Sequence, residues 1–320
     1  MSDSQDIPEH DVIIVGAGPA ALTAAIYTTR EDIDTLLFER GVIGGLAAVT
    51  DKIDNYPGFP DGVEGLKLAG DLQKQAERFG AKIELGEVTS IEDQGDWKLL
   101  KTTSGDMKAR SVLIATGSDY KKIGVPGEED FYARGVHYCA TCDGAFYRDK
   151  RLAVVGGGNS AFQEAIFLTR FASHIDLLVR STVKASDVLE DEMQKFVDAG
   201  KVTVHLGTAT EEIVGEEGKG VTKVIGTKDG KKVEFPTDGV FVFVGLKPNS
   251  QFLENSKIEF DDIGFVKTNQ DLETALPGVF AAGDIRSGAT MQIASAAGEG
   301  ATAALKIREH LEGRTHPVQN

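Results

Sequence analysis

Two cysteines, Cys139 and Cys142, are the only ones in this chain of 320 residues. They lie in the segment His137-Tyr-Cys-Ala-Thr-Cys-Asp-Gly144. Such a pair can cycle between dithiol and disulfide, form half of a metal site, or fill space in a core. A metal would need further ligands, and the six histidines show no H-x-x-x-H spacing. A stabilising disulfide is not favoured, because closing so short a loop removes little entropy from the unfolded chain. The spacing favours redox cycling, and we expect no metal.

Asp143 follows the second cysteine directly and is the nearest acid or base to the pair. Its carboxyl group could protonate a leaving thiolate or accept a proton from a thiol. Alternatively, Asp143 could stabilise the turn before Gly144, and the two roles are compatible. His137 is a rival proton carrier.

Two similar glycine-rich segments flank the cysteines. Each is an apolar run that ends in glycines and continues into a stretch with helical spacing. The glycines allow a pyrophosphate to approach the backbone, and a helix N-terminus attracts its charge. The segments are Asp11-Val-Ile-Ile-Val15 with Gly16-Ala-Gly-Pro-Ala-Ala21, and Arg151-Leu-Ala-Val-Val155 with Gly156-Gly-Gly-Asn-Ser-Ala161. Because their first glycines are 140 residues apart, they indicate one duplicated domain type rather than a short repeat.

We therefore predict an α/β protein with two Rossmann-like, three-layer domains of the kind that binds FAD or NAD(P). The length agrees with two separate cores. The late segment Gly278-Val-Phe-Ala-Ala-Gly-Asp284 again reads as strand, glycine and acid, which predicts that the second domain is inserted into the first. The expected domains are residues 1–120 with 248–320, and residues 121–247.

The two nucleotide segments differ at the end of the following strand. Glu39 lies 23 residues after Gly16, where a carboxylate can accept hydrogen bonds from the ribose of FAD or NAD. Arg180 lies 24 residues after Gly156, and a cation there suits a 2′-phosphate. The alternative is that Arg180 is only a solvated cation at a strand end.

Charge and hydropathy exclude some functions. A net charge of −16 argues against nucleic acid and anionic membrane as partners. No apolar run reaches the ~18 residues of a transmembrane helix, and the acidic N-terminus lacks the features of a signal peptide. We expect a cytoplasmic protein.

The motifs and their order resemble the low-molecular-weight thioredoxin reductases. The segments that carry the resemblance are Gly16-Ala-Gly-Pro-Ala-Ala21, Gly44-Gly45, Asn55-Tyr-Pro-Gly58, Ala115-Thr-Gly117, Cys139-Ala-Thr-Cys-Asp-Gly144, Gly156-Gly-Gly-Asn-Ser-Ala161 and Ala281-Ala-Gly-Asp284.

The resemblance implies an FAD held by the first and last segments, an inserted pyridine-nucleotide domain with the cysteines, a homodimer and a thioredoxin-like partner. Cys142 would accept electrons from the flavin, Cys139 would attack the partner disulfide, and Asp143 would be the acid, preferred to His137. The implied FAD residues are Gly16, Gly18, Ala21, Glu39, Gly45, Asn55, Thr116, Gly117, Asp284 and Gln292. The implied pyridine-nucleotide residues are Gly156, Gly158, Asn159, Ser160, Arg180 and Lys184.

The chain departs from the family where an arginine cluster binds the 2′-phosphate of NADPH. Arg180 remains, Ser181 replaces its neighbour, and Lys184 is the substitute for the last cation. Leu46 and Met291 also stand where many relatives have glutamine and arginine near the flavin. These changes count against NADPH and leave NADH, a reduced ferredoxin or a deazaflavin as alternative donors.

Other functions are compatible with the fold. A ferredoxin- or flavodoxin-NAD(P) reductase would share it, although such enzymes lack the dithiol. Two further alternatives do not reduce disulfides. One is a flavoprotein redox sensor, and the other is a dimer held by a Cys₄ zinc site.

Overall fold

The computed structural model describes residues 7–313, except residues 51, 217 and 219. The chain divides into two compact units. One contains the described residues up to Asp119 and from Lys247 onward, and the other contains Tyr120–Leu246, so the second unit interrupts the first in sequence. The chain leaves and re-enters the first unit through β9 (Ser118–Tyr120) and β18 (Leu246–Pro248), which pair with each other. In the described part of the chain, no helix has the length and apolar character needed to cross a membrane.

The first unit is built on a seven-stranded sheet. Its strands run in the order β5-β2-β1-β8-β7-β6, and β19 also pairs with β8. The pairings of β1 with β2 and β8, of β2 with β5, and of β19 with β8 are parallel, whereas β6-β7 and β7-β8 are antiparallel. The strands are β1 (Glu9–Val15), β2 (Thr35–Glu39), β5 (Lys82–Leu85), β6 (Val88–Gln94), β7 (Trp97–Thr102), β8 (Gly105–Ile114) and β19 (Val279–Ala281).

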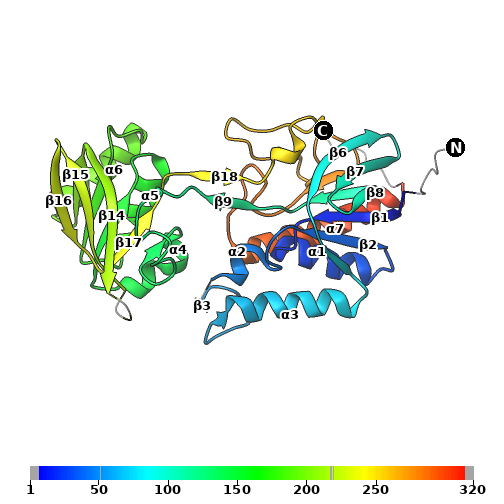
Figure 1. Cartoon of the computed structure of the whole chain (residues 1–320), viewed down its shortest axis with the longest axis horizontal. Helices are drawn as coiled ribbons and strands as arrows, with labels where there is room; N and C mark the ends of the chain where they lie inside the picture. The colour runs from blue at the N-terminus through cyan, green and yellow to red at the C-terminus, as the bar shows by residue number, and fades with distance from the viewer. Residues whose placement is uncertain (1–6, 51, 217, 219, 314–320) are drawn as a thin grey trace. The chain divides into compact units, whose positions relative to one another are not determined.

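Apolar side chains on both faces of the parallel strands explain their continuous hydrophobic runs. On one face, Ile14 and Leu37 pack against the helices, and on the other, Ile13 and Phe38 pack against the segment that contains Leu253. Figure 1 shows α1 and α3 along one side of β1 and β2, with β6 and β7 on the other. The remaining elements of this unit are α1 (Pro19–Thr29), α2 (Gly45–Ala48), β3 (Lys52–Ile53), β4 (Val63–Glu64), α3 (Gly65–Arg78), the 3₁₀ turn η2 (Gln251–Leu253) and α7 (Ile293–Leu311).

The second unit has a five-stranded parallel sheet in the order β10-β17-β11-β12-β13. Helices α5 and α6 cover one face, and an antiparallel sheet, β14-β15-β16, covers the other, which makes three layers (Figure 1). The antiparallel layer was not part of the sequence prediction. The elements are β10 (Val136–His137), α4 (Ala140–Asp143), the 3₁₀ turn η1 (Gly144–Tyr147), β11 (Arg151–Val155), α5 (Asn159–Leu168), β12 (His174–Val179), α6 (Asp187–Asp198), β13 (Val202–Leu206), β14 (Thr208–Glu216), β15 (Gly220–Lys228), β16 (Lys231–Pro236) and β17 (Gly239–Val242).

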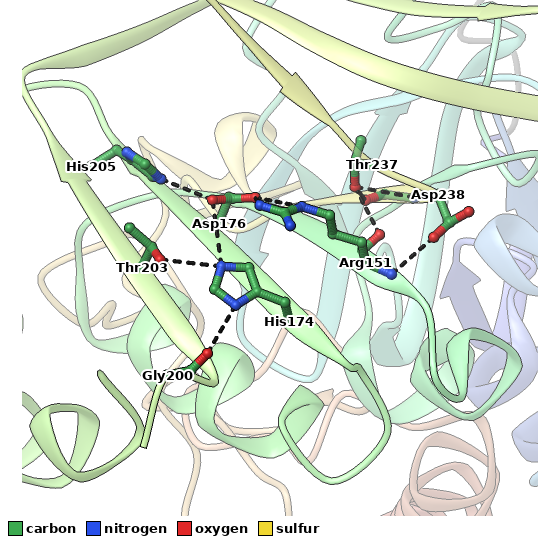
Figure 2. Close-up of polar contacts among 9 residues, drawn as sticks. Arg151, His174, Asp176, Gly200, Thr203, His205, Thr237 and Asp238 are labelled. Atoms are coloured by element: carbon green, nitrogen blue, oxygen red, sulfur yellow. Dashed lines mark hydrogen bonds and ion pairs between the residues drawn. The ribbon is translucent and has the colours of Figure 1, made fainter. Parts of the chain in front are cut away.

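A polar cluster lies on the second sheet around the buried Asp176 (Figure 2). Arg151 donates to Oδ2 of Asp176 at 2.9 Å, and Nε2 of His205 lies 2.9 Å from Oδ1. Nε2 of His174 is 3.6 Å from the same Oδ1. Burial acts to raise the pKa of Asp176, but the hydrogen bonds from His205 and Arg151 outweigh burial and hold this pKa below its usual value. The cluster therefore holds an ionised carboxylate inside the unit.

Candidate functional site

The two cysteines lie where β10 leads into the short helix α4. Cys139 caps this helix and is joined to Cys142 by a disulfide, with 5.3 Å between their Cα atoms. The backbone N–H of Cys142 donates to Sγ of Cys139 at 3.2 Å. The disulfide is what redox cycling requires, because it is the oxidised half of the cycle.

Residues before and after the cysteines form a row of polar contacts. Nδ1 of His137 lies 3.2 Å from Oδ2 of Asp143, and Nε2 of His137 lies 2.7 Å from the hydroxyl of Tyr147. Only 8% of the His137 side chain and 20% of the Asp143 side chain are exposed. The two proton carriers that the sequence placed in competition are therefore in contact with each other.

The neighbouring Tyr138 anchors the cysteine segment to the start of the second unit. Its hydroxyl donates to Oε1 of Glu128 at 2.8 Å, and the carboxylate of Glu128 also accepts from the backbone N–H groups of Ile123 and Gly124. The ring of Tyr138 stacks on Tyr120 at 5.3 Å. Burial, followed by the hydrogen bond to Glu128, raises the pKa of Tyr138, so its hydroxyl stays protonated and keeps donating.

The first glycine-rich turn joins β1 to α1. Gly16 has a φ of +107°, and a Cβ there would collide with the backbone of Ala115, so only glycine fits. A Cβ at Gly18 would meet nothing within 4 Å, which leaves the helix N-terminus open to an approaching group. Ala21 is fully buried in α1.

Glu39 at the end of β2 lies beside this turn. Its Oε2 accepts from the backbone N–H of Ala17 at 2.8 Å, and its Oε1 accepts from Gly41 at 2.7 Å. Each carboxylate oxygen has a second lone pair, so these bonds leave room for ribose hydroxyls. A pocket of the first unit is lined by Gly16, Glu39, Arg40, Gly86, Glu87, Thr116, Asn249 and Gln251, among other residues.

Asp284, after β19, has a buried Oδ1 with no hydrogen-bond partner among the described residues. Burial, and to a lesser extent the charge of Glu299, raises its pKa to about 6. A buried acceptor without a donor is costly, and a ligand hydroxyl would satisfy it. This orphaned oxygen therefore fits the ribitol hydroxyl of the FAD that the sequence led us to expect.

The remaining residues expected near the flavin come together in pairs. Nδ2 of Asn55 donates to Oε1 of Gln292 at 3.0 Å. The hydroxyl of Thr116 donates to the carbonyl of Asn249 at 2.8 Å, and Nδ2 of Asn249 donates back to the carbonyl of Thr116 at 3.1 Å. Asn249 was not among the sequence candidates, because no motif marks it.

Gly45 and Gly117 supply backbone shape at the same site. Gly45 begins α2 with a φ of +57°. A Cβ added at Gly45 would lie 3.7 Å from the Cα of Gly18, its nearest neighbour. Gly117 follows Thr116 with a φ of +65°. The first unit thus presents a glycine-lined turn, carboxylates and amides that can accommodate FAD.

The second glycine-rich turn joins β11 to α5. Gly156 has a φ of +148°, and a Cβ there would collide with the carbonyl of Phe243, whereas a Cβ at Gly158 would meet nothing within 4 Å. The backbone N–H of Lys184 donates to the carbonyl of Gly157 at 2.6 Å. The segment after β12 therefore lies against the turn.

The polar candidates of this second turn are exposed. Asn159 and Ser160 open α5, and Oδ1 of Asn159 accepts from the backbone N–H of Ser186 at 2.8 Å. Arg180 and Lys184 are also exposed, and their side chains have no hydrogen-bond or ion-pair partner among the described residues. Both cations remain free to meet a phosphate.

The relationship of His137 to Tyr147 was missed by the sequence analysis, as were the polar cluster at Asp176 and the role of Asn249. A signal existed only for Tyr147, which lies four residues after Asp143 in a segment that follows the cysteines. Nothing in the spacing of His174 and His205 indicates that both reach one carboxylate, because they belong to adjacent strands.

Known proteins resemble this chain over nearly its full length. Residues 10–300 match the family model described as pyridine nucleotide-disulphide oxidoreductase. A thioredoxin reductase of Bacillus subtilis (strain 168) is 43% identical over 305 residues, which are 95% of this chain and 95% of that protein. The crystal structure of thioredoxin reductase from Streptococcus pyogenes MGAS5005 matches with a TM-score of 0.90 at 38% identity, covering 95% of this chain and 99% of that one. Thioredoxin reductase from Giardia duodenalis matches with a TM-score of 0.89 at 30% identity, covering 95% and 99%.

Proposed function

We propose that this chain reduces the disulfide of a thioredoxin-like protein through Cys139 and Cys142, because it belongs to the thioredoxin reductases of the pyridine nucleotide-disulphide oxidoreductase family. The observation that carries this proposal is the disulfide between these two residues, with an acid directly after them. The protein is an FAD-dependent oxidoreductase.

The first unit holds the FAD. Gly16, Gly18 and Glu39 would bind the adenosine diphosphate, supported by the open turn and the carboxylate beside it. Ala21, expected from the sequence to bind it too, is fully buried in α1 and packs behind the turn. Asp284 binds the ribitol, supported by its orphaned Oδ1. Gly45, Asn55, Thr116, Gly117 and Gln292 would hold the flavin around its isoalloxazine ring. When bound, FAD supplies the two electrons that open the disulfide.

The dithiol then exchanges with the substrate. The Cys139 thiol loses its proton to Asp143, and the thiolate attacks one sulfur of the substrate disulfide, forming a mixed disulfide as the substrate S–S bond breaks. The leaving sulfur takes the proton from Asp143. Cys142, deprotonated in the same way, attacks Sγ of Cys139, which re-forms the internal disulfide and releases the second substrate thiol. Two electrons and two protons have passed to the substrate.

We propose that the second unit binds a pyridine nucleotide as the electron donor. Gly156, Gly158, Asn159 and Ser160 contact its pyrophosphate, supported by the open turn at Gly158. Arg180 and Lys184 bind the 2′-phosphate of NADPH, supported by their lack of protein partners among the described residues. The sequence left NADH, a reduced ferredoxin and a deazaflavin as alternatives, and a comparison of the four donors decides between them.

The working assembly is a homodimer in the cytoplasm. The resemblance to the family supports the dimer, which sedimentation velocity of the purified protein tests. The cysteines must return to the dithiol state in each cycle, which supports a reducing compartment such as the cytoplasm.

The test is anaerobic bleaching of the flavin by NADPH, NADH, reduced ferredoxin or reduced deazaflavin, followed by addition of an oxidised thioredoxin. We expect rapid reoxidation of the protein by thioredoxin. Cys142→Ser should abolish thioredoxin reduction and retain FAD, and Cys139→Ser should also fail to turn over. Full turnover of thioredoxin by either variant would refute the proposal.

A further inference from the structure

The ring of His137 is held at both nitrogens, close to the dithiol. One nitrogen, Nε2, lies 2.7 Å from the hydroxyl of Tyr147, and the other, Nδ1, lies 3.2 Å from Oδ2 of Asp143. The ring also stacks on Phe241 at 5.2 Å, and Tyr147 packs edge-on against the same Phe241 at 5.6 Å. Packing on Phe241 and the hydrogen bond to Tyr147 together fix the orientation of the imidazole.

The partners determine where the ring carries its proton. Burial, followed by the charge of Asp143, raises the pKa of Tyr147 well above its usual range, so its hydroxyl is protonated at neutral pH. That hydroxyl can donate to Nε2, which then carries no proton in the neutral ring. The proton of neutral His137 therefore lies on Nδ1, which faces Oδ2 of Asp143 at 3.2 Å. The hydrogen-bond network assigns this tautomer.

His137 is the main partner of this carboxylate. Among the described residues, no other side chain forms a hydrogen bond or ion pair with the Asp143 carboxylate. The other titratable groups that face the row are Tyr132, which interacts with Asp143, and Asp238, which interacts with Tyr147. Tyr132 is neutral at pH 7 because burial and Asp143 raise its pKa, and Asp238 is an acid, so neither stabilises a negative charge on Asp143.

On the basis of the proposed function, we propose that His137 is a positioning residue for thiol–disulfide exchange. Held by Tyr147, it orients the Asp143 carboxylate through the 3.2 Å contact of Nδ1 with Oδ2. Asp143 thereby remains a proton acceptor for a cysteine thiol, and passes that proton to the leaving sulfur.

The experiment uses the holoprotein reduced anaerobically. The rate of iodoacetamide alkylation of the peptide containing Cys139 and Cys142 is measured by mass spectrometry as a function of pH. His137→Phe removes the contact that orients the Asp143 carboxylate, so it should lower the alkylation rate along the acid limb of the profile by about tenfold. Asp143→Asn should remove this limb, and Tyr147→Phe should lower it by a smaller amount.

A rescue variant separates positioning from packing. In His137→Asn, the amide nitrogen is attached to Cγ, as Nδ1 is in histidine, and can donate to Asp143 in the same way. The limb should return toward that of the wild type, although the ring is lost. The value of kcat for thioredoxin should fall about tenfold in His137→Phe near the acid limb and recover in His137→Asn, with KM little changed.

The matched control is Tyr138→Phe, which also removes a tyrosine hydroxyl near the cysteines, but one that donates to Glu128 and does not contact His137. Its profile should coincide with that of the wild type. If His137→Phe does not fold, Tyr147→Phe carries the test. The inference is overturned if the His137→Phe and wild-type limbs coincide, or if asparagine is no better than phenylalanine. Failure of the wild type to reduce thioredoxin would overturn the proposed function, while the alkylation profile would still decide the role of His137.

Discussion

The side-chain amide of Asn55 donates a hydrogen bond of 3.0 Å to the side-chain oxygen of Gln292, across 237 residues of sequence. Asn55 follows the short strand β3, and Gln292 caps the N-terminus of α7. Gln292 is fixed further, because its own amide nitrogen donates to the carbonyl of Met291 at 2.8 Å. Two segments distant in sequence are thus joined at the site that we assign to the flavin.

Removing either amide should weaken the hold on FAD. We expect Gln292→Ala to raise the FAD dissociation constant by about tenfold, because a ligand-orienting hydrogen bond network contributes about 1.4 kcal/mol. Asn55→Ala should do the same, and the double variant should lose less than the two effects combined, since the residues share one hydrogen bond. Fluorescence titration of the FAD-free protein measures this. Fully independent effects would contradict the coupling.

The orphaned carboxyl of Asp284 should make the FAD-free protein less stable as the pH rises. Its pKa is raised from 3.8 to about 6, so the folded state holds a proton that the unfolded state releases between these values. The stability of the FAD-free protein should therefore fall between about pH 4 and pH 6, by about 3 kcal/mol from this group. In Asp284→Asn, this part of the pH dependence should vanish.

Thermal unfolding of the FAD-free wild type and of Asp284→Asn across this pH range measures the difference. The asparagine variant should be the more stable of the two at pH 8, and should bind FAD more weakly. A difference in unfolding temperature that stays constant with pH would show that Asp284 does not titrate as described.

The free cations beside the second glycine-rich turn should select between NADPH and NADH. A charged hydrogen bond to phosphate contributes about 1.5–3 kcal/mol, so Arg180→Ala should raise KM for NADPH by about tenfold or more. Lys184→Ala should have a smaller effect, and KM for NADH should not change in either variant, because NADH lacks the 2′-phosphate. Steady-state kinetics with both nucleotides gives the comparison.

Lys195→Ala is the control for that series, since Lys195 is an exposed cation in the last turn of α6. It should leave KM for both nucleotides unchanged. Equal rises in KM for NADPH and NADH in Arg180→Ala would show that Arg180 does not contact the 2′-phosphate.

The cluster around Asp176 should stabilise the second unit at neutral pH. Asp176→Ala should lower the free energy of unfolding by about 2 kcal/mol, because it leaves Arg151 and His205 without their acceptor (Figure 2). The pKa of Asp176 is lowered, so its contribution is present above about pH 4 and is lost as the pH falls through the folded-state value. Urea unfolding followed by far-UV circular dichroism at pH 7 and at about pH 2 measures both effects.

The exposed Asp198, at the end of α6, supplies the control. Asp198→Ala should change the free energy of unfolding by less than about 0.5 kcal/mol at either pH. An equal loss in Asp176→Ala at both pH values would mean that the charge of Asp176 is not what stabilises the unit.

Local sequence determined which elements form and what chemistry they carry. Gly16 and Gly156 could be recognised in the sequence because each has a positive φ and lies against a neighbouring backbone, where only glycine fits. The parallel strands could be recognised because burial on both faces demands apolar residues without a break. The cysteine pair and Asp143 were found for the same reason, since their chemistry depends on residues close in sequence.

Tertiary structure decided which distant side chains meet. Asn55 reaches Gln292, Asn249 reaches Thr116, and Arg151 and His205 reach Asp176 only because strands and helices far apart in sequence pack side by side. The same holds for His137, which the sequence placed near Asp143 but could not orient, because Phe241 and Tyr147 fix its ring. Hydrogen bonds depend on distance and direction, and neither is encoded in the spacing of residues along a chain.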